Sequence, residues 1–408
     1  MTRETLGRLR TFRIALVMAL AGLTACSAPP TGVDHPTATK VDVVKPFAKP
    51  GGGPFRVAVI QSGDYFAYND VLTSIRDGLV DLGWVGPAPL TTADKTTIPG
   101  ILAAWAKVPG SIEFPADQFI DLNWTEDPQP PAALTALLEG TRGVDLVVAL
   151  GTLAGTFVSK AGQAGTLKVP VMIESVSDPV GSKIVPSVTD SGNDHISASF
   201  DPQAYDRQVR LFHRLVGFKR LGLIYTDTET GRAYAAFDTV TKAAQDLGFQ
   251  IVPYTDVMED PPDPKDIPKA EAAYVKAMEA LGPKVDAVYL AVQAGLTQTS
   301  LPKVIAVAEK YHLPTFVMEG ADFVWRGTLL GESNTLQTVE GRYSAQKLTR
   351  ILAGAPLRTL PQSNPHVPHI AVNLAEARRI GFDLPVDVLL SADDVFTSIL
   401  TDPQGAHP

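Results

Sequence analysis

The sequence predicts an α/β protein of two lobes, each a parallel β-sheet covered by helices. Short apolar, β-branched runs alternate along the chain with segments that have the residue spacing of amphipathic helices. The runs are uniformly apolar and do not alternate with polar residues, which is typical of parallel strands buried on both faces. The alternation comes as two successive series, and 408 residues are enough for two domains of ordinary size.

The first series lies between residues 55 and 200. Its first helix shows how the helices are identified: apolar side chains at 71, 72, 75, 79 and 82 have helical spacing, and Gly83 follows as a cap. Residues 196–203 have the pattern of a crossover to the second series. The expected strands are 55–61, 119–124, 145–150 and 169–175, and the expected helices are 70–82, 98–108, 131–142 and 153–162.

The second series begins at residue 205 and is followed by a tail that returns to the first lobe. A tail of this kind gives a hinge of several strands over a cleft, suited to closure around a ligand. The expected strands are 220–225, 249–254, 285–292, 314–318, 328–330 and 369–372, and the expected helices are 205–215, 233–247, 269–281, 301–311, 339–352 and 373–381.

The first 25 residues have the pattern of a secretory signal peptide. Arginines at 3, 8, 10 and 13 precede an apolar run at 14–24, which is shorter than the roughly 20 residues that a membrane-spanning helix needs. The run ends in LTAC at 23–26, which resembles a bacterial lipobox, where the cysteine becomes the lipidated first residue. Cys26 is the only cysteine in the chain. A plain signal peptide with a chance cysteine is the alternative.

Residues 26–53 are rich in Pro, Gly, Thr and Ala, have no hydrophobic pattern, and are expected to be a flexible tether. The net charge of −9 argues against nucleic-acid binding, which needs basic patches against phosphate. We therefore expect a domain anchored by lipid, such as palmitate, on the periplasmic or extracellular face of a bacterial membrane.

Ligands of open parallel sheets bind beyond the carboxyl ends of the strands, and polar residues at those ends are the candidates for a binding site. Thr152 is a candidate for a ligand carboxylate, or an N-cap. Ser177 and Asp178 follow the next strand, where Asp178 could equally fix a turn before Pro179. Ser62 and Tyr65 follow the first strand. They are candidates for donating a hydrogen bond to the ligand or for lining its site, and the alternative is that they are ordinary exposed loop residues.

The second lobe offers acidic and amide side chains at its strand ends. Glu229 is a candidate for holding a ligand ammonium or for capping the next helix. Gln293 follows the strand at 285–292, and Glu319 follows the strand at 314–318. Glu319 or Asp322 could supply an anion that Gln293 lacks.

Catalytic motifs are absent from the sequence. It contains no nucleophile elbow of the form G-x-S-x-G, no P-loop, and no G-x-G-x-x-G after a strand. The seven histidines are scattered, and His366 and His369 are a poor metal pair with no cysteine or carboxylate cluster beside them. We expect no enzyme activity, no metal and no cofactor.

Seven segments in order resemble the substrate-binding lipoproteins of ABC importers, in the group similar to periplasmic tryptophan-binding proteins with the type I periplasmic-binding fold. The resemblance covers most of residues 55–395, and VPVMIESVSDPVGSKIV at 169–185 is its most specific segment. The other segments are VAVIQ at 57–61 with DGLVDLGW at 77–84, VDLVVALGT at 144–152, RLGLIYTDTE at 220–229, VDAVYLAV at 285–292, LPTFVMEGADFVWRG at 313–327, and the tail at 352–395.

The chain departs from this family pattern in three places. Residues 88–117 are an insertion between the first helix and the second strand. Gln293-Ala294 stands where the family tends to have Asp-Asn, and only Glu229 is kept in the loop at 226–232. Two of these departures lie at strand ends of the second lobe, so an aromatic amino acid cannot simply be carried over as the ligand.

The resemblance implies an extracytoplasmic protein that captures a small solute, such as an amino acid, between its lobes and delivers it to an ABC permease. A ligand-sensing receptor subunit with the same clamp is the alternative, and a secreted α/β enzyme is a third. We assign residues 54–197 to lobe 1, with about 328–358 crossing back to it, and residues 198–327 to lobe 2, with about 365–400.

Overall fold

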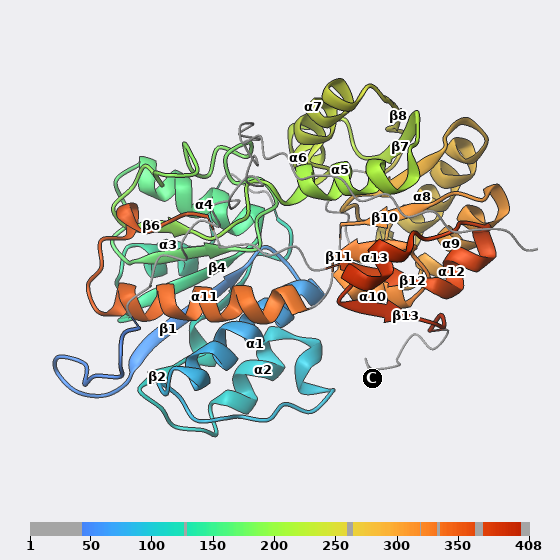
Figure 1. The fold of residues 1–408 in the computed structure, drawn as a ribbon. Helices are drawn as coiled ribbons and strands as arrows, with labels where there is room; N and C mark the ends of the chain where they lie inside the picture. The colour runs from blue at the N-terminus through green and yellow to red at the C-terminus, as the bar shows by residue number, and fades with distance from the viewer. Residues whose placement is uncertain are drawn as a thin grey trace, which may run out of the picture. The chain divides into compact units, whose positions relative to one another are not determined.

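The computed structural model describes residues 43–125, 129–258, 264–318, 320–332, 335–363 and 370–400, and these ranges form two β-sheets with helices on both sides (Figure 1). The expected signal peptide and Cys26 lie outside the described residues, as does Glu319. Among the described residues, no helix has both the length and the apolar character that a membrane span requires.

The first sheet has six strands, all parallel. β1 is central: β4 pairs with one edge, and β2 and β3 pair with the other at successive positions. The strand order runs from β4 through β5 to β6. The strands are β1 (Phe55–Gln61), β2 (Ile112–Glu113), β3 (Phe119–Asp121), β4 (Leu146–Leu150), β5 (Val171–Glu174) and β6 (Ile196–Ala198).

Helices bury both faces of this sheet, which is why its strands are uniformly apolar. Val57 and Val59 of β1 pack into one core with α1, α2 and α11, whereas Ala58 and Ile60 pack into the opposite core with α3 and α4. The helices are α1 (Phe66–Asp81), α2 (Ile98–Trp105), α3 (Ala132–Leu138), α4 (Thr152–Gln163) and α11 (Thr335–Leu352).

The second sheet has seven strands in the order β13-β12-β11-β10-β9-β7-β8. All pairs are parallel except β11 with β12, which is antiparallel because the chain has visited the first lobe between them. The strands are β7 (Arg220–Ile224), β8 (Gln250–Tyr254), β9 (Ala287–Leu290), β10 (Thr315–Val317), β11 (Leu330–Glu332), β12 (Ile370–Asn373) and β13 (Asp394–Phe396).

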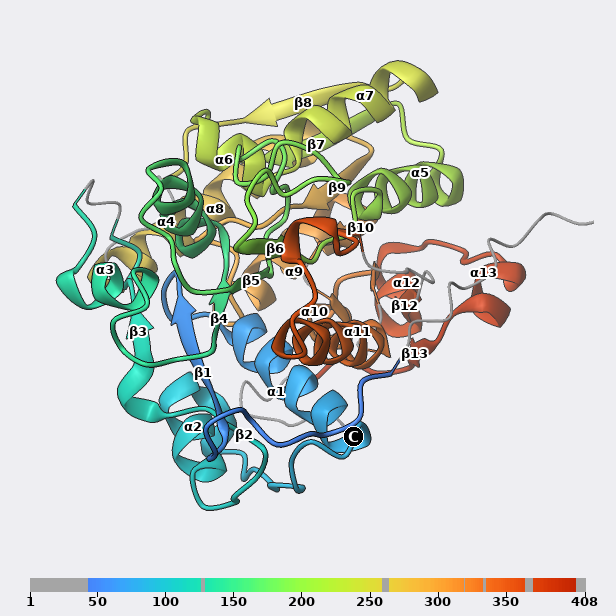
Figure 2. The same ribbon diagram turned by 90° about the vertical axis from the view of Figure 1, so that its left-hand side faces the viewer.

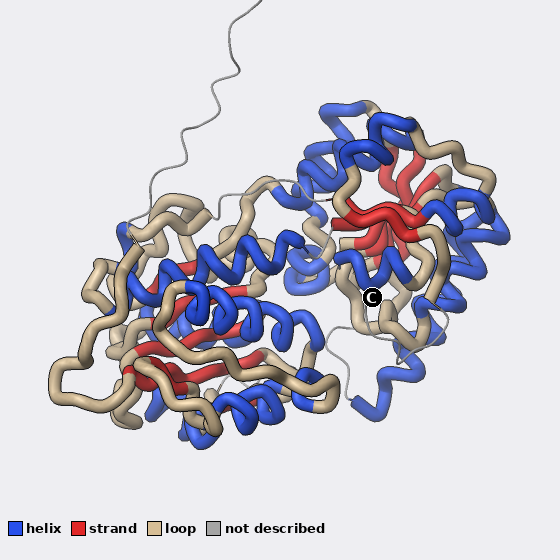
Figure 3. The backbone as a smooth tube through the Cα atoms, turned by 60° about the horizontal axis from the view of Figure 1, so that its bottom comes forward, coloured by secondary structure: helices blue, strands red, loops and turns tan. Residues whose placement is uncertain are grey.

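Helices again lie on both sides of the strands (Figure 3). One core takes side chains from α5, α7, α12 and α13, and the other takes side chains from α8, α9 and α10. The helices are α5 (Ala204–Val216), α6 (Glu229–Tyr234), α7 (Phe237–Leu247), α8 (Ile267–Leu281), α9 (Leu301–Tyr311), α10 (Gly320–Trp325), α12 (Leu374–Ile380) and α13 (Val386–Ser391).

The chain passes between the two sheets three times: after β6, after β11, and between α11 and β12. We call these the first, second and third connections. After the second connection, α11 packs alongside α1 of the first lobe (Figure 2). The first and third connections also touch, through a bridge between Phe200 and Ser363.

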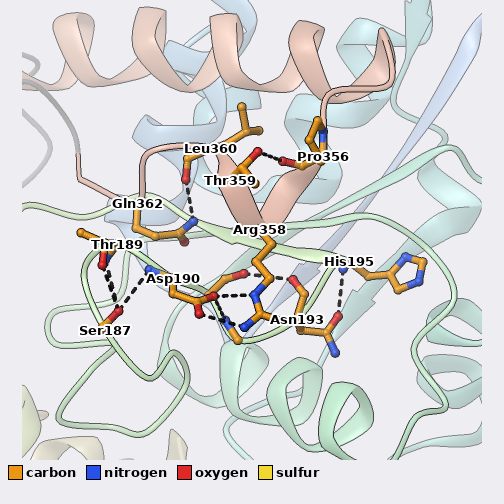
Figure 4. A network of polar contacts seen from close by, with 12 residues as sticks. Ser187, Thr189, Asp190, Asn193, His195, Pro356, Arg358, Thr359, Leu360 and Gln362 are labelled. Carbon is orange, nitrogen blue, oxygen red and sulfur yellow. Dashed lines mark hydrogen bonds and ion pairs between the residues drawn. The ribbon is translucent and has the colours of Figure 1, made fainter.

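The third connection is fastened to the loop before β6 (Figure 4). The Nε and Nη2 atoms of Arg358 donate to the two carboxylate oxygens of Asp190, at 2.7 and 2.8 Å. Asp190 also accepts a hydrogen bond from the Gly192 amide, and these partners hold its pKa at about 2, below the ordinary value. The returning tail is thereby attached to the first lobe by side chains as well as by α11.

Several elements differ from the sequence predictions. The helix predicted at 233–247 is two helices, because Ala236 has a left-handed φ of 47° that ends α6 before α7 begins. Helices α10 and α13 and strands β2 and β13 were not predicted, since each has only two to six residues and so offers little periodicity. The start of the crossover predicted at 196–203 is strand β6, which pairs with β5. In contrast, α9 has the predicted bounds, 301 to 311.

One buried acid lies away from all of these connections. Glu376, in the first turn of α12, is fully buried, and neither carboxylate oxygen has a hydrogen-bond partner among the described residues. Burial is the main cause that raises its pKa to about 8; the nearby Glu309 carboxylate acts in the same direction, and Arg379 opposes the shift. The neutral form is therefore the one that the fold accommodates.

We predict that Glu376→Gln removes a loss of stability at alkaline pH. The folded-state pKa of about 8 lies above the ordinary value of 4.5. The stability that protonation supplies is therefore fully present below pH 4.5 and is lost as the pH rises through 8. Urea unfolding at pH 6 and pH 9 should show wild-type stability falling by on the order of 3 kcal/mol, and the variant falling much less. Equal declines in both proteins would contradict the assignment.

Candidate functional site

The carboxyl ends of three neighbouring strands lie at one level of the first sheet. Gln61 at the end of β1 pairs with Leu150 at the end of β4, and Leu150 pairs with Glu174 at the end of β5. The loops after these strands therefore start side by side. This register brings Ser62, Thr152 and the loop at 175–178 to the same edge of the sheet, as parallel topology requires.

Ser62 joins two of these loops and is completely buried. Its Oγ donates to the Leu150 carbonyl (3.0 Å) and accepts from the Ala154 amide (3.0 Å) in the first turn of α4. A hydroxyl that accepts a hydrogen bond from an amide of the first turn acts as a helix cap, here supplied by the loop after β1. Ser62 is thus a structural part of the site, not an exposed loop residue.

Gly151, between β4 and α4, makes room for this contact. It has φ 89° and ψ 170°, a backbone conformation that residues other than glycine rarely adopt. A Cβ atom at this position would lie 2.6 Å from the Ser62 Oγ, and closer still to the Tyr68 hydroxyl. The glycine therefore lets three segments meet at the start of α4.

Aromatic rings line the same strand ends. Tyr65, in the N-cap position of α1, packs against Phe66 and Tyr68 with ring centroids 4.9 and 5.1 Å apart. Trp124 follows β3 in a left-handed conformation (φ 55°), and its ring lies over Gly63 and 6.3 Å from Tyr68. Tyr65 was predicted from the sequence, whereas Tyr68 and Trp124 were not, although aromatic residues shortly after a strand end were the available signal.

A cavity of about 270 Å³ lies between the start of α4, in the first lobe, and α6, in the second. It unites two predicted residues, Thr152 at the start of α4 and Glu229 at the start of α6. Its surface combines hydroxyls, two aromatic side chains, and charges of both signs. The lining residues are Thr152, Leu153, Thr156, Phe157, Lys160, Ser182, Glu229, Thr230, Ala233 and Tyr234.

Glu229 carries an ammonium partner, and a neighbour caps its helix. The N-cap of α6 is Thr228, whose Oγ1 accepts from the Gly231 amide at 3.0 Å. The Glu229 carboxylate instead accepts from Lys183 Nζ of the first lobe at 2.7 Å, and this bond holds the pKa of Glu229 below its ordinary value. Both side chains are more than 70% exposed, so the pair contributes little stability and can exchange partners.

Asp178 fixes the turn that brings Lys183 to this place. Its Oδ1 accepts from the Gly181 amide (2.7 Å), and its carbonyl accepts from the Ser182 amide (2.9 Å). Asp178 and its half-buried neighbour Ser177 do not line the cavity. Direct contacts thus support the turn-fixing alternative for Asp178. Ser182, which lines the cavity, and Lys183, which binds Glu229, were not predicted from the sequence.

Gln293 is buried, and both ends of its amide are used within the second lobe. Nε2 donates to the Met258 carbonyl (2.9 Å), and Oε1 accepts from the Gly295 amide (2.7 Å). Gln293 therefore shapes the loop after β9 and does not line the cavity. Asp322, the other candidate anion, accepts from Gln298 and Arg326 at 2.9 Å each.

Comparison with known proteins agrees with this architecture. Residues 124–396 match a family model described as ABC transporter substrate binding protein. Similar solved structures include an ABC domain in complex with L-Trp from Streptococcus pneumonia, with 17% identity, a TM-score of 0.60, and coverage of 84% of this chain and 100% of that chain. A conserved domain protein from Vibrio cholerae has 19% identity and a TM-score of 0.61, with the same coverage.

A substrate-binding protein with adhesive properties from Clostridium difficile, in its ligand-free open form, has 17% identity and a TM-score of 0.57. The match covers 85% of this chain and 100% of the Clostridium difficile chain. At these identities the likeness concerns the fold, and it confirms the two-lobed periplasmic-binding fold predicted from the sequence. A search of curated proteins found no match.

We predict that Gly151→Ala destabilises the protein by more than about 2 kcal/mol, because it adds a clash to an unfavourable backbone conformation. Gly165→Ala is the matched control: Gly165 also has a positive φ (72°), but no atom lies within 4 Å of the place that its Cβ would take, so only the backbone cost of about 1 kcal/mol applies. Denaturant unfolding measures both. Equal losses in the two variants would show that the contact with Ser62 and Tyr68 is unimportant.

Proposed function

The chain belongs to the family of ABC transporter substrate-binding proteins, and from this premise we propose which class of solute it captures and where. It is the solute-binding component of an ABC transporter. Proteins of this class work outside the cytoplasm, together with a permease in the membrane. We propose that the solute is a small zwitterion of the amino-acid type, and that it binds in the cavity between α4 and α6.

The observation that carries this proposal is that the cavity takes its walls from both lobes. A solute in contact with both walls stabilises the arrangement in which the lobes are together, and it thereby shifts the population toward that form. Residues from only one lobe would give binding without closure. Thr152 and Glu229 are the residues on the two walls that the sequence analysis already selected.

The charges of the cavity suit a zwitterion. The amino-terminal end of α4 offers amide donors and the Thr152 hydroxyl for a carboxylate. Lys160 adds a positive charge from the last turn of the same helix, at the other end of the wall. Glu229 offers an acceptor for an ammonium, a position that Lys183 Nζ fills in this structure. Phe157 supplies an apolar surface for the rest of the solute.

We predict that a panel of amino acids, peptides, sugars and purines contains a zwitterion that raises the melting temperature. A solute at 100 times its dissociation constant should stabilise by about 2.7 kcal/mol. Glu229→Gln should weaken that affinity by about tenfold or more, since it removes the charge that faces the ammonium. Calorimetry on both proteins measures the change.

The control is Glu279→Gln, which also breaks an exposed glutamate–lysine pair, with Lys310 at 2.7 Å, but lies outside the cavity lining. It should leave the affinity unchanged. A panel in which only sugars or purines give shifts would rule out the zwitterion proposal, and equal losses in the two variants would rule out Glu229 as the ammonium contact.

We further propose that the protein is anchored by lipid at Cys26. The signal-like segment at 1–25, the LTAC sequence at 23–26 and the tether-like composition of 26–53 support this proposal. The tether would let the solute-binding lobes reach the permease while they stay at the membrane surface.

We predict that Cys26→Ser releases the protein from membranes, because the serine cannot accept the thioether-linked lipid. Fractionation of cells that express each protein, with detection in the membrane and soluble fractions, measures the release. Ser27→Ala is a neighbouring control that should leave the distribution unchanged. Membrane retention of the Cys26→Ser protein would exclude the lipid anchor.

A further inference from the structure

A buried, charged network lies in the first lobe, outside the cavity. Lys347 on α11 is 4% exposed, and its Nζ donates to the Ala198 carbonyl and to the Ser199 Oγ, both at 2.7 Å. Glu174, the last residue of β5, is also 4% exposed, and its Oε2 accepts from the Ser344 Oγ of α11 at 3.1 Å. An acidic and a basic side chain therefore join β5, β6 and α11 in the interior.

This network is a poor source of stability, because burying charged groups costs desolvation free energy. Burial raises the pKa of Glu174 and lowers the pKa of Lys347, although each charge favours the charged form of the other. Replacing a buried ion pair by apolar residues is often neutral or stabilising, whereas removing one partner alone is strongly destabilising. A role in geometry therefore explains the network better than a role in stability.

Lys347 binds the segment where the chain leaves the first sheet. Ala198 is the last residue of β6, and Ser199 is the first residue of the first connection. The same segment is held from its other side by Gln362 of the third connection. The Gln362 Oε1 accepts from the Ala198 amide (2.6 Å), and its carbonyl accepts from the Phe200 amide (3.1 Å).

Glu174 links α11, which carries Lys347, to the first-lobe wall of the cavity. Its side chain is bound to α11, and its main-chain carbonyl accepts from the Gly151 amide at 3.0 Å. Gly151 is the N-cap of α4, and Thr152, the next residue, lines the cavity. Glu174 thus contacts both α11, whose Lys347 binds the first connection, and the start of α4, which forms the first-lobe wall.

We propose that Glu174 and Lys347 are positioning residues that fix the first connection relative to the start of α4, and thereby set the geometry in which the second lobe meets the cavity. Neither side chain lines the cavity. The proposal goes beyond the solute class, and only its consequence for affinity rests on the proposed function.

The test uses the full-length protein carrying Lys347→Met, Glu174→Gln, or both changes, without solute and at one pH. Each single variant should lose stability, because a buried charge loses its partner, and the double variant should recover much of that loss. Amide hydrogen exchange at Ser199 and Phe200 should nevertheless be at least tenfold faster than wild type in the double variant.

The control is Leu348→Ala, which removes packing from the neighbouring, fully buried position of α11 without touching the network. It should lower global stability and leave the exchange at Ser199 and Phe200 unchanged relative to other core amides. A double variant that is as stable as wild type and exchanges as slowly at Ser199 and Phe200 would overturn the proposal, even if a single variant fails to fold.

A second measurement separates this proposal from the proposed function. The probe is a mixture of the twenty common L-amino acids, added to wild type and to the double variant in a thermal-shift titration. A wild-type response that weakens at least fivefold in the double variant supports both proposals. No wild-type response would count against the amino-acid class, while the exchange experiment still decides whether Glu174 and Lys347 position the connection.

Discussion

The close approach of α1 and α11 is the contact on which the rest of the architecture depends. A Cβ atom on Gly78 of α1 would lie 2.7 Å from the Ala345 side chain, and one on Gly341 of α11 would clash with Ser74. The two helices thus pack with main chain against main chain at these points, which only glycine permits. Ala345, Leu348 and Ile351 then complete the apolar core beneath.

This contact explains why the chain passes between the sheets three times. Since α11 belongs to the last fifth of the chain yet completes the first-lobe core, the chain must return after β11 and leave again before β12. The antiparallel pairing of β11 with β12 follows from that excursion. Three connections also limit how the lobes can move, because a motion of one lobe must be accommodated by all three at once.

The sequence was most informative about the strands and helices. Uniform apolar runs and helical spacing predicted most of the strands and most of the helices in order, since these patterns follow directly from burial. Thr152 and Glu229 were selected because they follow strands, and both line one cavity; that they bind a solute stays a prediction. The break at Ala236 could not be predicted, because nothing in an alanine indicates a left-handed conformation.

Roles that depend on partners distant in the sequence were beyond sequence reasoning. Ser62 was a candidate ligand donor, with an ordinary loop residue as the alternative, and its capping of α4 arises only because β1 and β4 are in register. Gln293 followed a strand end, as a ligand contact would, but its amide is occupied by Met258 and Gly295. Lys183 and Glu229 are 46 residues apart, and both types of side chain are common on surfaces.

A comparison of Lys183 and Glu229 with Lys347 and Glu174 illustrates how burial decides what a charge can do. Lys183 and Glu229 are exposed, so their attraction is screened by water and a solute ammonium can replace the lysine at little cost. Lys347 and Glu174 are buried, so neither charge can leave without a large desolvation penalty on the other. The exposed pair is therefore suited to exchange with a ligand, and the buried pair is suited to hold the chain in one place.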